Sequence, residues 1–420
     1  MNTAPQNDKS KAPQSPAGAG LMALLAVADF RRIWSIGIFS GIVRWLELLA
    51  FGIYVFDQSG SALLVATFTL LRFAPFGFVG ALTGALVDRF GHRNVLRYSL
   101  LMMVLSAGTL SGLALFDRLE LWHLGIATVL GGIYWTTDFP ARRNYLGLLA
   151  GNDMLARALS FDAASNTLTR ALGPLFGGAL IAALGISGVL VLTFVAYLIA
   201  WLLALRLTPQ DRPAHSVAIS MARNILDGFK YASTRRKLLA AFAITVIYNL
   251  FGFPYTTLIP VIGKETLGLA PDAVGLIAAL EGFGAMTGAL LVARARSESQ
   301  LWRTYIGGVV ITTIGVAMMG LGQQVGIVAF SIAFAGLGGG LFAASQITLT
   351  YRLSPPEQRS RMLGILAICI GVAPLGLAWL GYIADLIGSG PSLLMMSAEG
   401  VVSLVLFWLI YARDVRAVDE

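Results

Sequence analysis

The sequence predicts an all-α membrane protein with twelve transmembrane helices in two pseudo-symmetric six-helix bundles. Of its 420 residues, 57% are hydrophobic and only 12% are charged, whereas soluble proteins carry about 25% charged residues. Apolar runs long enough to cross a bilayer recur from residue 33 to residue 411. The run at 284–294 repeats the apolar half of the run at 80–96, which indicates a duplicated unit.

Each apolar run is expected to form one spanning helix of roughly 20 residues. Unpaired backbone groups cannot face lipid, and the Gly-rich runs lack the alternating polarity of a transmembrane β-barrel. The expected spans are 33–57, 62–87, 94–116, 121–147, 158–184, 187–207, 238–262, 271–293, 304–322, 326–351, 360–386 and 391–411.

Polar segments divide the chain into five parts. Residues 1–32 are rich in Pro, Ala, Ser and Gln and lack the pattern of a secretory signal, so a disordered cytoplasmic tail is expected. Two six-helix bundles are expected at 33–207 and 238–411, with a C-terminal tail at 412–420. The cytoplasmic linker at 208–237 contains a helical apolar repeat, which fits either an amphipathic helix on the bilayer or a solvated one.

The distribution of Lys and Arg predicts the orientation. With twelve spans, only Arg118 and Lys264 fall on the side opposite the termini. Basic loops stay in the cytoplasm, so both termini are expected there, and the net charge of +8 is explained by topology rather than by nucleic acid. The single Cys369 excludes an intramolecular disulfide and a cysteine-cluster metal site.

The internal repeat predicts how the two halves are related. Gly-Ala-X-Thr-Gly-Ala-Leu ends both span 2 and span 8, and Gly173-Pro174 in span 5 resembles Ala373-Pro374 in span 11. Equal shifts of six spans predict parallel halves related by an axis along the membrane normal. That arrangement places a substrate site between the halves near the midplane and indicates alternating access.

The segment that contains Gly84, Asp88, Arg89, Gly91 and Arg93 resembles the loop 2-3 signature of the major facilitator superfamily, with a histidine where a second basic residue is usual. With the spans, the resemblance covers most of the chain. It implies that these residues form a conformational latch, in which the aspartate pairs with nearby arginines and faces the end of span 11. A merely solvated loop is the alternative, although glycine at position 91 also suits a tight turn.

Two weaker resemblances favour export. Gly173, Pro174, Gly177 and Gly178 resemble the end of the signature of drug/proton antiporters, although a proline kink with small-residue packing between spans 5 and 8 explains them equally. The stretch 137–174 is similar to the enterobactin-exporter-like branch. Together they imply a bacterial inner-membrane protein that secretes siderophores or confers multidrug resistance.

Several charges lie inside expected spans, where each must pair or face water. Arg44 and Glu47 are three residues apart, hence on one face of span 1, near mid-membrane. Asp162, Asn166 and Arg170 recur every four residues, which predicts a polar stripe on span 5. The residues expected to line a cavity or gate are Arg44, Arg72, Arg170, Asp162 and Asn166.

Span 8 carries a further embedded acid, Glu281, and spans 5 and 8 meet across the halves in this superfamily. We therefore expect an interdomain gate between Arg170 and Glu281. Asp138 in span 4 either joins a cytoplasmic ion network with Asp88 or has another role. Glu399 in span 12 either lies near the outer interface in water or is embedded.

Proton coupling requires an acid that gains its proton on one side and releases it on the other. Glu47, Glu281 and Asp138 are the candidates, although a lasting pair with Arg44 would make Glu47 structural. Aromatic residues in spans 1, 4 and 7 are expected to supply part of the cavity: Trp45, Tyr54, Tyr134, Trp135, Tyr248, Phe251, Phe253 and Tyr255.

Other classes of protein fit less well. The chain has no nucleotide-binding or zinc-protease motif and only three scattered histidines, so we expect no enzyme activity, cofactor or metal, with the proton gradient as energy source. A monomer that moves a small-molecule substrate across a lipid bilayer, without nucleic acid, is the prediction. An importing symporter, a facilitator, a channel and a non-transporting receptor remain alternatives.

Overall fold

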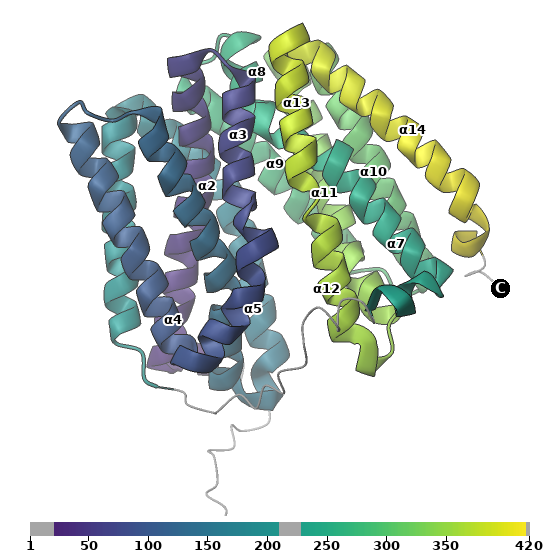
Figure 1. Ribbon diagram of the computed structural model, residues 1–420, viewed down its shortest axis with the longest axis horizontal. Helices are drawn as coiled ribbons and strands as arrows, with labels where there is room; N and C mark the ends of the chain where they lie inside the picture. Colours follow the sequence, from purple (N-terminus) through teal and green to yellow (C-terminus); the bar gives the residue numbers. More distant parts are fainter. Residues whose placement is uncertain (1–20, 210–227, 417–420) are drawn as a thin grey trace, which may run out of the picture.

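The computed structural model describes residues 21–209 and 228–416, which are almost entirely helical (Figure 1). Only the backbone is described for 77–88 and a few other residues. Among the described residues, nine helices are long and apolar enough to cross a membrane. One of these, 157–205, has 49 residues and is interrupted at Gly185, where φ is 62°. The described chain is therefore an all-α, multi-pass membrane protein.

The first half consists of four main elements, two of which contain internal breaks. They are α2 (Ala28–Ser59), α3 (Ala62–Phe73), α4 (Pro75–Leu115) and α5 (Leu121–Leu205), and a short α1 (Leu21–Ala26) precedes them. The backbone leaves helical geometry at Gly91 in α4 and at Gly151 and Gly185 in α5. At Gly91 φ is 76° and ψ is 153°, a combination that is essentially restricted to glycine and costs a residue with a Cβ about 1–3 kcal/mol. The glycine therefore permits the tight turn that the sequence predicts.

The second half begins with an irregular helix. Its first segment, α7 (Arg236–Ile247), continues as a π turn at Tyr248–Gly252 and a 3₁₀ turn at Phe253–Leu258 before α8 (Ile259–Glu265). Pro254 cannot donate a backbone hydrogen bond, which accounts for the loss of the α pattern there. The remaining elements are α9 (Pro271–Val292), α10 (Glu298–Leu321), α11 (Val325–Arg352), a 3₁₀ turn at Pro356–Gln358, α12 (Arg359–Ile370), α13 (Ala373–Ile387) and α14 (Ser389–Arg416).

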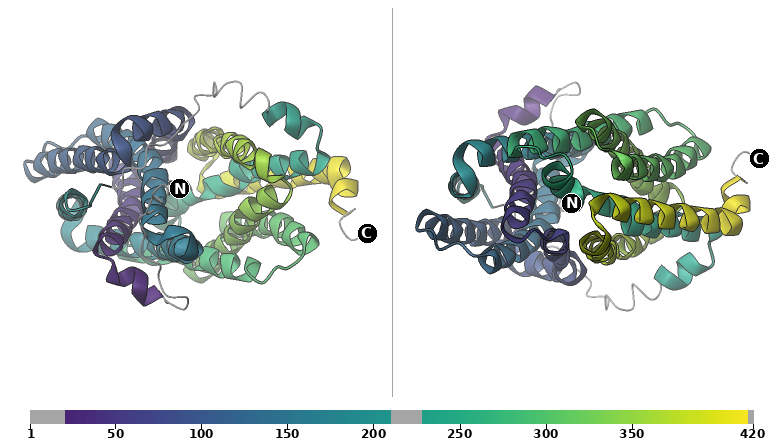
Figure 2. Two further views of the ribbon diagram at one scale, coloured as in Figure 1. Left: turned by 90° about the horizontal axis from the view of Figure 1, so that it is seen from below. Right: turned by 90° about the horizontal axis from the view of Figure 1, so that it is seen from above.

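The two sets of helices lie side by side. Figures 1 and 2 show α2–α5 on one side and α7–α14 on the other. The sets meet where α3 contacts α13, α5 contacts α9, and α2 contacts α8. We call the end at which α2 begins and α14 ends the terminal end, and the end that carries the turns at Gly60, Gly268 and Gly388 the far end.

Apolar packing joins the two sets near the far end. One buried cluster combines Val65 and Phe68 of the first set with Ile259, Ile277 and Leu380 of the second. Two further clusters, one around the start of α2 and one around α10, each belong to a single set. The shared core therefore lies at one end of the interface.

The predicted N-terminal tail is wrong for residues 21–32, which are helical apart from the bend at Val27. Asp29 accepts hydrogen bonds from the backbone N–H and the side chain of Thr208 and pairs with Arg32 at 2.7 Å. Because Phe30 is fully buried, these contacts fasten the start of α2 to the end of α5. Residues 1–20 and 417–420 lie outside the described chain.

The predicted linker and C-terminal tail are also shorter than expected. Residues 228–233 are helical, α7 begins at Arg236, and α14 continues to Arg416. Arg236 forms an ion pair with Asp414 at 3.0 Å, which holds the last turn of α14 against the start of α7. Residues 210–227 lie outside the described chain, so the expected amphipathic helix stays a prediction.

Candidate functional site

Polar contacts hold the two sets of helices together at the far end. Lys264 forms an ion pair with Asp57 at 3.1 Å. Asp385 accepts hydrogen bonds from the hydroxyl of Ser61 at 2.7 Å and from the backbone N–H of Leu63 at 3.0 Å, so it satisfies donors in the first turn of α3. These residues connect the end of α2 and the start of α3 with α8 and α13.

Deeper in the interface, the hydroxyl groups of Thr69 and Thr257 lie 2.8 Å apart, and the rings of Phe73 and Phe253 meet edge to face with centroids 5.4 Å apart. Phe73 is eleven positions after Ala62, the first residue of α3, which corresponds to about 16 Å at 1.5 Å per residue. The closed part of the interface therefore extends to about half the depth of a bilayer.

Two ion pairs join the two sets of helices in the described chain, and the pair of Arg170 and Glu281 lies farther from the far end than that of Asp57 and Lys264. Arg170 Nε donates to Glu281 Oε2 at 3.0 Å, and its Nη2 donates to Oε1, so the contact is bidentate. Their side chains are 24% and 9% exposed. Glu281 is ten residues after Pro271, about 15 Å from the far end. The guanidinium also lies over the ring of Trp45, 5.3 Å from its centroid. A charge contact thus joins α5 and α9 near mid-membrane.

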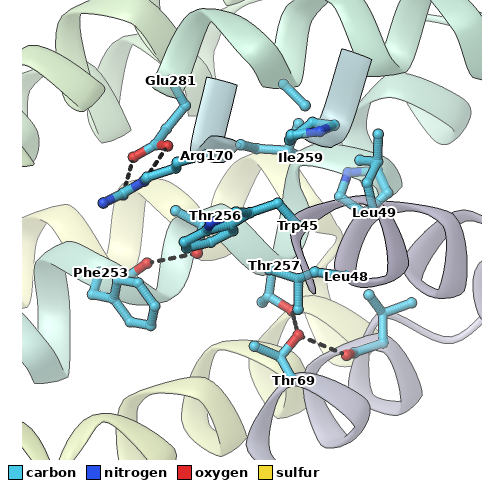
Figure 3. Close-up of a pocket in the computed structure, with 14 residues that line it drawn as sticks. Trp45, Leu48, Leu49, Thr69, Arg170, Phe253, Thr256, Thr257, Ile259 and Glu281 are labelled. Atoms are coloured by element: carbon cyan, nitrogen blue, oxygen red, sulfur yellow. Dashed lines mark hydrogen bonds and ion pairs between the residues drawn. The ribbon is translucent and has the colours of Figure 1, made fainter. Parts of the chain in front are cut away.

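A small cavity adjoins this pair (Figure 3). Its volume is about 60 Å³, room for a few water molecules, whereas a drug-sized ligand needs about 300 Å³ or more. Trp45 Nε1 is buried there without a hydrogen-bond partner among the described residues. Trp45 and Phe253 are the only residues of the eight predicted aromatics that line this cavity in the described chain. Tyr134, by contrast, is buried against Ser40 within the first set.

The close approach of α5 and α9 depends on small residues. A Cβ added to Gly178 would lie 2.6 Å from Gly275 Cα, and one added to Gly282 would lie 2.6 Å from Ala171 Cα. Gly173 and Gly177 instead face α2, where an added Cβ would meet backbone atoms of Leu46. The predicted packing motif therefore faces two helices. Of its three glycines only Gly178 faces α9, where the backbone oxygen of Pro174 also lies against Gly275.

The first set contains a buried ion network at the terminal-end side of the pair. Arg142 contacts Asp138 at 3.4 Å and also contacts Asp162, which Arg143 approaches at 3.3 Å. Arg44 completes the network 3.6 Å from Asp138 and lies over Trp135, 4.5 Å from its centroid. All these contacts stay within one set of helices.

Two sets of embedded charges find different partners from one another. Glu47 pairs with Arg72 at 2.8 Å rather than with Arg44. The two residues of α2 are three positions apart and diverge by about 60° around the helix, enough to direct one to α3 and the other to α5. The residues of the predicted stripe on span 5 have different surroundings: Asp162 is buried within the first set, Asn166 is half-buried, and Arg170 reaches Glu281 of α9.

The latch residues are described only in part. Gly84 is described by its backbone alone and the side chain of Asp88 lies outside the described residues, so the pairing of the aspartate stays a prediction. Arg89 is exposed, with its guanidinium 5.3 Å from the ring centroid of Phe90, and Arg93 is half-buried beyond the turn at Gly91.

The family model described as transmembrane secretion effector matches residues 19–420. The chain belongs to this branch of the major facilitator superfamily. Macrolide efflux protein A of Streptococcus pyogenes is 21% identical over 364 residues, which cover 86% of this chain and 90% of the relative. The staphyloferrin A transporter of Staphylococcus aureus (strain NCTC 8325 / PS 47) is 21% identical over 385 residues, covering 90% and 95%.

A solved structure shares the fold. A bacterial homologue of the human lysosomal transporter Spinster, in an inward-facing and occupied conformation, has a TM-score of 0.70 and 15% sequence identity, and the match covers 95% of this chain and 96% of that chain. The major facilitator fold therefore extends over the described helices.

Sequence reasoning missed the far-end contacts. Asp57 and Asp385 were not singled out, and Lys264 served only as an orientation marker. Opposite charges at span ends on the same side of the membrane were the available signal, but which of them pair depends on how the two halves are placed.

Proposed function

We propose that this secretion effector is a secondary active transporter with twelve spans in two six-helix bundles. It exports a siderophore or a lipophilic drug-like compound by alternating access, in exchange for protons. The observation that carries the proposal is the Arg170–Glu281 pair, because it joins the two halves at mid-depth beside a cavity. The names of the macrolide and staphyloferrin A relatives support export.

The contacts support an inward-facing conformation. The interhalf contacts described above lie between the far end and the middle of the helices. If the basic loops mark the cytoplasm, the terminal end is cytoplasmic and the far end is external. The inward-facing state of the Spinster homologue is consistent with this assignment. The bacterial inner membrane is the proposed location.

Glu281 is the coupling residue in this proposal. Glu47 and Asp138 keep their arginine partners inside one half, so a movement of the halves as rigid bodies leaves those pairs intact. The partner of Glu281 lies in the other half and is lost when α5 and α9 separate. An external proton then neutralises the exposed carboxylate, and return of Arg170 displaces that proton toward the cytoplasm.

A flux assay tests this function. Purified protein is reconstituted into liposomes, and the molecules with their cytoplasmic side outward are followed with an acidic lumen. Uptake of a macrolide, staphyloferrin A and a lipophilic cation is measured with and without the pH gradient. We expect gradient-dependent accumulation of at least one compound; accumulation that ignores the gradient would contradict proton exchange.

The variant Glu281→Gln separates coupling from transport. It is expected to exchange labelled for unlabelled substrate but to lose accumulation driven by the gradient. Protein-free liposomes give the leak. Accumulation by Glu281→Gln equal to that of the parent protein would remove Glu281 from the coupling mechanism.

A further inference from the structure

A second cavity lies on the outer face of the C-terminal half. It is a groove of about 480 Å³ lined by Phe251, Trp379, Met395, Ala398, Glu399, Val402 and Ser403. Figure 1 shows α14, which supplies most of this lining, on the side away from the N-terminal helices. Neighbouring side chains of α14 such as Val405 and Leu409 are exposed, as expected for a helix that faces lipid. The groove is thus separate from the cavity at the interface.

Glu399 lies near the middle of the membrane in this groove. It is ten residues after Ser389, the first residue of α14, or about 15 Å along a helix of about 42 Å. Trp379 is eight residues before the end of α13, about 12 Å from the same end. A depth of about 15 Å is half of a hydrocarbon core of about 30 Å, so it favours the embedded position for Glu399 over the alternative in water at the outer interface.

Within the described residues, the carboxylate of Glu399 has a hydrogen-bond donor but no cationic partner. Trp379 Nε1 donates to its two oxygens at 3.0 and 3.2 Å. No lysine or arginine in the described chain forms an ion pair with it. Intramembrane carboxylates normally pair or face water. In the described part of the chain, no positive charge therefore balances the carboxylate in this groove.

The lining specifies what could supply that charge. The rings of Trp379 and Phe251 line the groove beside the carboxylate, and aromatic faces attract cations. Met395, Ala398 and Val402 supply an apolar wall open to the lipid. The volume is within the range of clefts that hold drug-sized ligands. A ligand that fits has one cationic head and an apolar body.

We propose that this groove binds the ammonium head of a lipophilic cation dissolved in the bilayer, with Glu399 as its counter-ion. The site goes beyond the proposed export function and does not require transport. A phospholipid amine headgroup fits less well, because its phosphate would have to enter the hydrocarbon layer with it.

Photolabelling tests the site. The protein is placed in phosphatidylcholine nanodiscs and exposed to an alkyl trimethylammonium probe that carries a benzophenone, without any gradient. Mass spectrometry is expected to locate labels on α13, α14 or the turn at Phe251. Glu399→Gln should lower this labelling about tenfold, whereas Asp414→Asn, at the end of the same helix, should not change it.

Two further controls make the outcome decisive. A neutral isosteric probe should label weakly and respond little to Glu399→Gln. Glu281→Gln protein should keep the groove labels, which separates this site from the transport proposal. Equal labelling of Glu399→Gln and parent protein, equal labelling by the neutral probe, or crosslinking of two copies through α14 in place of probe labelling would overturn the proposal.

Discussion

Gly178→Ala should shift the conformational equilibrium of the transporter. In the present conformation the added Cβ would lie 2.6 Å from Gly275 Cα and 2.8 Å from its N atom, both backbone atoms that cannot rotate away. Ordinary contact at a Cβ requires 3.4–4 Å. The substitution therefore forces α5 and α9 apart at the far end.

The size of the effect follows from overpacking. A forced shift of this kind costs about 1–3 kcal/mol. Alanine also favours helix by about 1 kcal/mol over glycine, but that gain cancels because α5 is helical in both conformations. The ratio of far-end-open to far-end-closed molecules should rise about 5–150-fold.

Spin-label distances measure this ratio. Arg118→Cys and Glu265→Cys place labels on exposed far-end sites of the two halves, and Cys369→Ser removes the native thiol. The matched control is Gly112→Ala, since a Cβ at Gly112 meets nothing within 4 Å. An unchanged far-end distance distribution in Gly178→Ala, or an equal change in the control, would refute the reasoning.

Two further predictions concern the buried charges. Alanine substitutions of Arg170 and Glu281, measured singly and together in a double-mutant cycle, should lower the transport rate non-additively. The expected coupling energy is about 0.5–3 kcal/mol. Additive losses would show that the pair does not act as a unit. Asp138→Asn removes the carboxylate partner of Arg44 and one of the two carboxylate partners of Arg142. This loss should lower the free energy of unfolding by about 3–5 kcal/mol. The exposed pair lost in Asp414→Asn should cost below about 1 kcal/mol in the same thermal-unfolding assay, and equal losses would contradict the burial argument.

Local features of the fold were predictable from the sequence. The apolar runs set the helix positions, and the glycine turn at position 91 followed from its place within the charged segment that ends an apolar run. The helix ends were less predictable. Asp29 and Thr208 are far apart in sequence, and their hydrogen bonds extend α2 into a segment whose composition alone indicates a tail.

The partner of an embedded charge was predictable only where the pairing of the helices left one opposite charge within reach. Arg170 and Glu281 are the charges on two helices that meet at small residues, so their contact followed from the helix pairing. Glu47 had two arginines within reach along the chain and across the bundle, and small rotations of α2 decide between them. Side chains from several helices also determine the groove at Glu399, so no single span indicated it.

The most direct test of alternating access is a pair of distances in one protein. Labels at Arg118 and Glu265 report the far end, and labels at Tyr98 and Ser233, also exposed, report the terminal end. On addition of a transported substrate at low pH, the far-end distance should lengthen while the terminal-end distance shortens. Two distances that move in the same direction, or neither moving while flux continues, would contradict the account.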